Sequence, residues 1–262
     1  MNNNKKKHWA VIVLASLLAA SCSSVGDDER LVYVKPADVA RKVLIEDFTG
    51  QRCVNCPNAT DEIARLQEAY GEDNVIAVGI HSGPLGFYTR GNILGLRTQT
   101  GDEYYDYWHV EYQPAGVINR KGGVQNYTAW QGTIQTDIQE TARIMLTLEA
   151  TTTEGQLRTT VKTLGTNGTV TGKLQLWVIE DGITALQMMP DGSSNANYVH
   201  NHVFRAAVNG TWGTDITIRE GEEKESTFSI ALSDDWNPER LSIVAFVYND
   251  GGVEQVERVA VE

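Results

Sequence analysis

The sequence has few cysteines, few basic residues and only one long apolar run. Of its 262 residues 3 are cysteine, and they fall into two groups, Cys22 alone and Cys53 with Cys56. Lysine and arginine number 22 against 34 acidic residues, so no binding of nucleic acid through its phosphates is expected. No second long apolar run follows the amino terminus, so no later segment is expected to cross a bilayer.

The amino terminus is arranged like a secretory signal peptide. Three lysines at positions 5–7 precede the uncharged stretch 9–20, and small residues then lead to Cys22. This order resembles a bacterial lipoprotein signal over residues 1–22, in which cleavage leaves the cysteine acylated and so anchored in a membrane. Ala19 stands where such signals usually carry leucine, and ordinary secretion is the alternative.

Residues 23–42 predict an acidic tether and a lead-in to the folded part. The segment carries Asp27, Asp28 and Glu29 and lacks periodicity, which is typical of a flexible linker. Removing the three signal lysines leaves 19 basic against 34 acidic residues, a net charge of −15. Acidic residues just after the cysteine also resemble the signal that sends lipoproteins of some Gram-negative anaerobes to the cell surface.

Residues 43–142 have the pattern of an α/β domain. Apolar runs predict strands at 43–48, 74–81 and 116–119, and a turn follows at 121–123. Helical spacing of apolar residues predicts one helix between the first two strands and another after the turn. The apolar positions are Ile63, Leu66, Ala69 and Tyr70 in the first helix and Trp130, Ile134 and Ile138 in the second. This order of strands and helices indicates an α/β layout.

Residues 143–262 have a period of two instead. Apolar and polar residues alternate in several short runs, and Gly-containing turns such as those at 154–155 and 181–182 separate the runs. Short strands at this spacing predict an all-β antiparallel, immunoglobulin-like sandwich.

Cys53 and Cys56 form a Cys-x-x-Cys pair between the predicted strand 43–48 and a helix. In such a pair one thiolate attacks a disulfide and the second, one turn away, resolves the mixed intermediate. The run from Val43 to Cys56 resembles the thioredoxin superfamily, in which an apolar strand leads through Asp-Phe to the cysteines. The resemblance implies a thioredoxin-like domain with Cys53 as the exposed nucleophile and Cys56 as the buried resolving thiol. It also implies that Asp47 is the buried carboxylate that moves the resolving thiol's proton.

A proline farther along the chain extends the resemblance. Pro114 precedes an apolar strand, where thioredoxins have a cis-proline opposite the cysteines, and proline holds a cis peptide at low cost. The resemblance implies that Gln113 and Pro114 bind the backbone of a peptide substrate. Arg52 replaces the tryptophan that usually precedes the first cysteine, and its positive charge favours the Cys53 thiolate and a substrate contact.

The start of the helix bears on the reactivity of Cys53. Pro57 is favoured in the first turn of a helix, so Asn55 or Cys56 is expected to be the cap. Cys53 then lies ahead of the first turn, where the helix dipole stabilises its thiolate only weakly. The pKa of Cys53 is therefore expected to lie only modestly below the free value of about 8.5.

Two other interpretations of the cysteine pair stay open. Exported proteins live under oxidising conditions, so the pair can be a static structural disulfide. A zinc site needs three or four protein ligands, but only two thiolates are present and no histidine pair is near at ligand spacing. We therefore expect no metal and no other cofactor.

A few further residues stand out. His81 ends the predicted strand 74–81 at the sheet edge where α/β proteins bind ligands, or it simply caps the strand. The aromatic stretch 101–112 predicts either a peptide-binding lip or a helix that packs inward. His200 and His202 are expected on one solvent-facing strand surface, preceded by a long loop at 191–195.

The signal, the tether, the Cys-x-x-Cys-Pro run and a sandwich containing His-Asn-His-Val-Phe-Arg together resemble one family. It is the outer-membrane lipoprotein family of Gram-negative anaerobes that is named for its twenty-eight-kilodalton founding member. The resemblance implies a lipid anchor in the outer membrane, with the protein facing the surface or the periplasm. We expect thiol-disulfide exchange on a protein or peptide disulfide substrate. The alternative is a non-catalytic adhesion protein that uses the fold as a scaffold for an unknown surface ligand.

Overall fold

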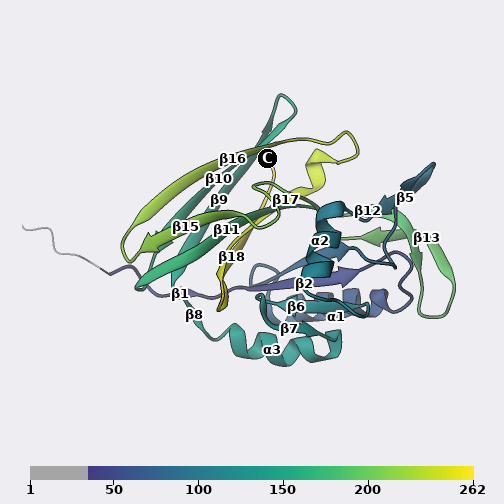
Figure 1. Cartoon of the computed structure of the whole chain (residues 1–262), viewed down its shortest axis with the longest axis horizontal. Coiled ribbons are helices and arrows are strands. Elements are labelled where there is room, and N and C mark those ends of the chain that lie inside the picture. Colours follow the sequence, from purple (N-terminus) through teal and green to yellow (C-terminus); the bar gives the residue numbers. More distant parts are fainter. Residues whose placement is uncertain (1–34) are drawn as a thin grey trace, which may run out of the picture. The chain divides into compact units, whose positions relative to one another are not determined.

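A sheet of nine strands is the largest element in the part of the chain that the computed structural model describes, residues 35–262 (Figure 1). Its order is β18, β17, β11, β14, β3, β2, β6 and β7, and β15 pairs with β11 outside this path. The strands are β2 (Val43–Thr49), β3 (Val75–His81), β6 (Ala115–Ile118), β7 (Lys121–Gln125), β11 (Thr169–Glu180), β14 (Val203–Ala207), β15 (Thr214–Arg219), β17 (Leu241–Asn249) and β18 (Gly252–Ala260). The predicted signal, Cys22 and most of the tether lie outside the described residues.

Three helices and several smaller sheets complete the described part. The helices are α1 (Cys56–Tyr70), α2 (Gln99–Tyr107) and α3 (Trp130–Asp137), with short 3₁₀ turns at Tyr127–Ala129 and Pro238–Arg240. One sheet has the order β16 (Glu223–Ala231), β10 (Gln156–Gly165), β9 (Ile144–Thr153). Three pairs are β1 (Val39–Ala40) with β8 (Thr141–Ala142), β4 (Tyr88–Arg90) with β5 (Ile93–Leu96), and β12 (Ile183–Met188) with β13 (Ser194–His200). Within residues 35–262, none of the helices has the length and apolar character needed to span a membrane.

The first part of the sheet is built around β2, which is buried on both faces. It pairs in parallel with β3 across the connection through α1, and antiparallel with β6, which then pairs with β7. Because side chains alternate along a strand, Val43 and Ile45 pack in a core with residues of α1 and α3. Leu44 and Phe48 pack on the opposite face, in a core shared with α2 and the later strands. The predicted strands and helices of this region are present, but the turn expected at 121–123 is the beginning of β7.

The second part is antiparallel and β-rich, as expected. Strand β9 alternates strictly between buried and exposed residues, and Ile144, Leu146 and Leu148 face a second core together with β10. Strand β11 contributes side chains to both cores. Leu176 and Val178 pack in the second core with β9 and β10, whereas Trp177 and Ile179 pack in the core shared with β2. The protein is therefore mostly β, with several antiparallel sheets.

One short strand connects these two parts of the sheet. Strand β14 pairs antiparallel with β11 and in parallel with β3 through Val203 and Gly79. The amide of Gly79 also donates a hydrogen bond of 2.8 Å to the carbonyl of His202. Residues 35–262 form one compact unit, and the sheet runs across residue 142. The division into domains at 43–142 and 143–262 stays a prediction.

Candidate functional site

A disulfide joins Cys53 and Cys56 between the end of β2 and the start of α1, with an S–S distance of 2.09 Å. Helix α1 begins at Cys56, with Asn55 as its N-cap and Pro57 in its first turn. Proline is favoured there because the first amides of a helix have no intrahelical acceptor. One of the two predicted caps is therefore present, and Cys53 lies before the helix.

Both cysteines are buried, each with 2% of its surface exposed. The expectation of an exposed Cys53 is wrong because segments distant in sequence cover it. The amide of Gln187 in β12 donates a 2.8 Å hydrogen bond to the Cys53 carbonyl. On the other side, the backbone amide of Arg52 donates to the Leu85 carbonyl at 2.9 Å. Arg52 places its guanidinium over the ring of Phe87, 5.2 Å from the centroid.

Asp47 lies in β2 and is buried, with 3% of its surface exposed. Burial raises the pKa of its carboxyl group to about 7, because the charged form loses its hydration. Its Oδ1 atom has no hydrogen-bond partner. Asp47 and Cys56 line the same cavity, so a carboxyl group that titrates near neutral pH lies in the cavity wall with the second cysteine.

Gln113 and Pro114 lead into β6, and the peptide bond between them is cis. Ala115, the next residue, pairs with Phe48 of β2, which puts Pro114 beside the end of β2 that leads to Cys53. The Gln113 side-chain amide donates to the carbonyls of Thr49 at 2.7 Å and Ser82 at 3.1 Å. The Gln113 side chain therefore holds together the loops after β2 and β3.

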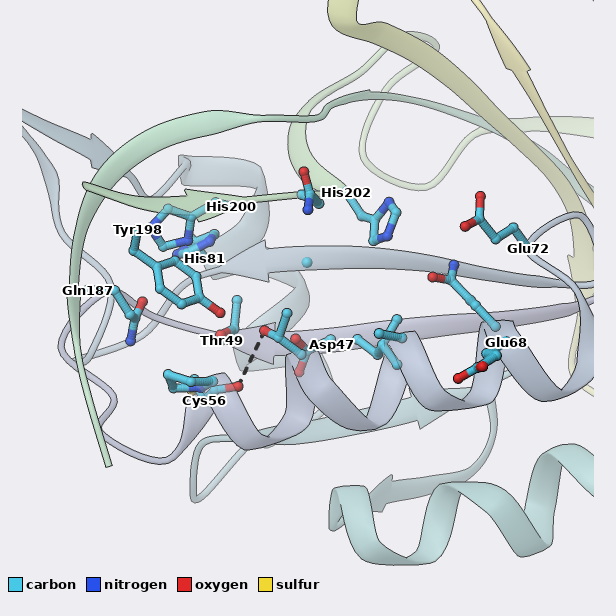
Figure 2. Close-up of a pocket in the computed structure, with 17 residues that line it drawn as sticks. Asp47, Thr49, Cys56, Glu68, Glu72, His81, Gln187, Tyr198, His200 and His202 are labelled. Carbon is cyan, nitrogen blue, oxygen red and sulfur yellow. Dashed lines mark hydrogen bonds between the residues drawn. The ribbon is translucent and has the colours of Figure 1, made fainter. Parts of the chain in front are cut away.

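A cavity of about 450 Å³ lies along α1, beside the disulfide (Figure 2). Besides Asp47, Cys56 and the expected His81, it is lined by Gln187, Tyr198 and His200 from the β12–β13 hairpin. Sequence reasoning missed Gln187 and Tyr198, because no motif relates a residue of this hairpin to a cysteine some 130 positions earlier. The only available signal was the cluster of histidines at the end of β13.

The histidines differ from expectation. His200 ends β13 and is buried, whereas His202 lies in the turn to β14 with a φ of 56°, so the two do not share a strand face. The rings of His81 and His200 are 5.2 Å apart. Burial lowers the pKa of His200 to about 4 and that of His81 well below its usual value, so both are neutral at pH 7. The segment 191–195, expected as a long loop, is the tight turn of the hairpin and the start of β13.

The aromatic stretch at 101–112 was expected to form either a peptide-binding lip or a helix that packs inward, and it contains both buried and exposed aromatic residues. Most of it is helix α2, and Tyr104 is fully buried against Trp177 and Phe204. Tyr107 and Tyr112 are exposed, at 57% and 45% of their surface. Among the described residues, no group of three or more His, Cys, Asp or Glu side chains is arranged to hold a metal ion.

The fold and the site define a mostly β protein with a buried Cys-x-x-Cys disulfide at the start of a helix. The model of the family "Outer membrane protein Omp28" matches residues 101–262. Because this is more than half of the chain, the protein belongs to that family, which places it at the outer membrane. The matched region includes Pro114 and the β12–β13 hairpin but not the two cysteines.

Solved structures give a further comparison. HBP35 of Porphyromonas gingivalis is 15% identical, with a TM-score of 0.67 over 86% of this chain and 77% of that one, so the two share a fold. A domain of the outer membrane lipoprotein Omp28 from Porphyromonas gingivalis is 26% identical over 46% of this chain and 89% of that one, with a TM-score of 0.35. Among curated proteins, no sequence matches the chain.

Proposed function

We propose that this outer membrane protein is lipid-anchored through Cys22 and exchanges thiols and disulfides with envelope or surface proteins through a thioredoxin-like module. The observation that carries the proposal is the disulfide between β2 and α1 with Asp47 buried behind it. The order β3, β2, β6, β7, with α1 and α3 packed on one face of these strands, supports the proposal of a thioredoxin-like module.

The reaction is a balanced exchange of two electrons. A thiolate of the substrate attacks Sγ of Cys53, the Cys53–Cys56 bond breaks, and the thiolate of Cys56 leaves. The second substrate thiolate then attacks the substrate sulfur of the mixed disulfide and displaces the thiolate of Cys53. The substrate is thereby oxidised to a disulfide, and both cysteines are left reduced. Asp47, whose pKa is raised to about 7, supplies the proton that Cys56 takes up. The reverse sequence reduces a substrate disulfide, and the reduction potential decides the direction.

The second candidate is a surface binding protein in which the disulfide is structural. The burial of both cysteines, each 2% exposed, favours it, because an exchange reaction requires access to a sulfur atom. In that case the fold is a scaffold, and the ligand binds elsewhere on the protein.

The reduction potential of the Cys53–Cys56 pair separates the two candidates. For exchange we expect a value between about −120 and −270 mV after equilibration in glutathione or dithiothreitol buffers. Cys53→Ser should abolish the turnover of a disulfide peptide, whereas Met145→Leu, an exposed change on β9, should retain it. A potential below about −300 mV would identify a structural disulfide and favour the binding protein.

A further inference from the structure

The cavity beside the disulfide is an elongated groove along one face of α1. The lining residues of the helix follow a spacing of three and four, which places them on one face. They are Cys56, Pro57, Thr60, Ile63, Ala64, Gln67 and Glu68, followed by Glu72 just after the helix. From Pro57 to Glu68 the helix rises by about 17 Å, so the groove is long relative to its volume.

The end of the groove near the disulfide presents polar atoms that lack partners. Oδ1 of Asp47, Nδ1 of His81 and Nε2 of His200 are buried without hydrogen bonds, in side chains at most 6% exposed. The ring of His200 also interacts with the backbone of Ala185 and Leu186. In the tautomer of the neutral ring that is protonated at Nδ1, Nε2 presents a lone pair. Asp47 and His200 therefore both offer acceptors to a ligand that brings hydrogen-bond donors.

The other end of the groove is acidic. Glu68 and Glu72 are exposed there. Figure 2 shows these two side chains at one end of the groove and Cys56, Tyr198 and His200 at the other. Within residues 35–262, no lysine or arginine lines the groove. Ile63 and Ala64 give its middle part an apolar wall. Acceptors at one end, carboxylates at the other and methyl groups between them suit a flexible aliphatic chain that carries positive charges.

We propose that this groove binds alkylammonium groups, with the aliphatic chain along Ile63 and Ala64 and the ammonium groups at Asp47 and at Glu68 and Glu72. The ligand is either a free linear polyamine, whose several ammonium groups reach both ends of the groove, or the lysine side chain of a peptide, whose single ammonium group occupies one end; both are alkylammonium ligands. Binding of such a ligand in the groove does not depend on the proposed exchange reaction. A role of the groove in selecting lysine-containing substrates does rest on that reaction.

Calorimetric titration of the full-length protein in detergent at pH 8 tests the proposal. Two probes are used: spermidine, and a tripeptide acetyl-Gly-Lys-Gly-amide with its lysine-acetylated form as the control. We expect spermidine or the lysine peptide to bind at one site and the acetylated peptide not to bind. Tighter binding of spermidine would identify a free polyamine as the ligand, and tighter binding of the peptide would identify a protein substrate.

Charge-matched variants then locate the site. Glu68→Gln with Glu72→Gln should weaken binding about five- to tenfold, because two partly screened ion pairs are lost. Asp47→Asn should weaken it at least as much, because it removes the buried negative charge and places an amide donor against the ammonium group. Glu149→Gln with Glu154→Gln removes the same charge from β9 and the following turn and should leave the affinity unchanged. Absence of binding by both probes, an equal loss in both double variants, or an unchanged affinity in Asp47→Asn would overturn the proposal. A disulfide potential below about −300 mV would refute exchange alone and leave this binding result intact.

Discussion

At the scale of single residues, Asp47 is held in an environment that opposes its charge. It is buried with an unpartnered Oδ1, and its pKa rises from 3.8 to about 7. A carboxylic acid with a folded-state pKa above its unfolded value binds more protons when folded. Its contribution to stability is therefore complete below the unfolded pKa and is lost as the pH rises toward 7. Keeping such a residue costs stability at neutral pH, which is typical of groups retained for function.

Asp47→Asn should remove this pH dependence. Between pH 4 and pH 8 the wild-type protein should lose about 4 kcal/mol of unfolding free energy relative to the variant, since three pKa units correspond to that energy. The neutral histidines His81 and His200 act in the opposite direction below pH 6.5, but they are present in both proteins and cancel in the difference. Urea unfolding at a series of pH values measures the difference, with Asp73→Asn on the surface as the control. A difference that stays constant with pH would contradict the assigned environment of Asp47.

At the scale of elements, the β12–β13 hairpin closes over the disulfide. Gln187 donates to the carbonyls of Cys53 at 2.8 Å and Gly50 at 3.4 Å, and the Met188 amide donates to the Gln51 carbonyl at 2.9 Å. The side chain of Gln51 in turn donates to the Leu186 carbonyl at 3.2 Å. We therefore expect the opening of these contacts to limit the rate at which a thiol reaches the disulfide.

Gln187→Ala should accelerate reduction of the disulfide by dithiothreitol. Loss of the buried hydrogen bonds, each worth about 1 kcal/mol, should increase the rate by about fivefold or more. The rate is followed by alkylating the free thiols in samples taken at intervals and counting the alkylated protein cysteines by mass spectrometry. Thr184→Ala, at an exposed position of the same strand, should leave the rate unchanged. Equal rates in wild type and Gln187→Ala would mean that the hairpin does not control access.

The elements also show what local sequence can predict. Strand β2, helix α1 and the proline before β6 were predicted because each depends on residues within a few positions, such as Pro57 in the first turn. Two features could not be predicted: the pairing of β14 with β3 and the position of β12 over Cys53. Both depend on contacts between residues more than a hundred positions apart, and the alternation within a strand does not specify its partner. The prediction that Cys53 is exposed was wrong for this reason.

At the scale of the whole molecule, a buried ion pair connects the early and late strands. Arg120, between β6 and β7, donates to Glu46 of β2 at 2.8 Å, with side chains 4% and 0% exposed. Its guanidinium also lies within 5.3 Å of the ring centroids of Trp177, Phe246 and Tyr248, which belong to β11 and β17. Arginine favours such stacking because its planar cation is only weakly hydrated.

Arg120→Met should therefore destabilise the strands on both sides of residue 142 together. Leaving Glu46 buried without its partner should cost about 3–5 kcal/mol, whereas Glu46→Gln with Arg120→Met should cost less than the sum of the single changes. Arg143→Met breaks the more exposed pair with Glu254 and should cost at most about 1 kcal/mol. Urea unfolding followed by tryptophan fluorescence and circular dichroism should show one transition that shifts as a whole. If a second transition kept its wild-type midpoint, the strands after residue 142 would fold independently, and the predicted boundary between two domains would be a real one.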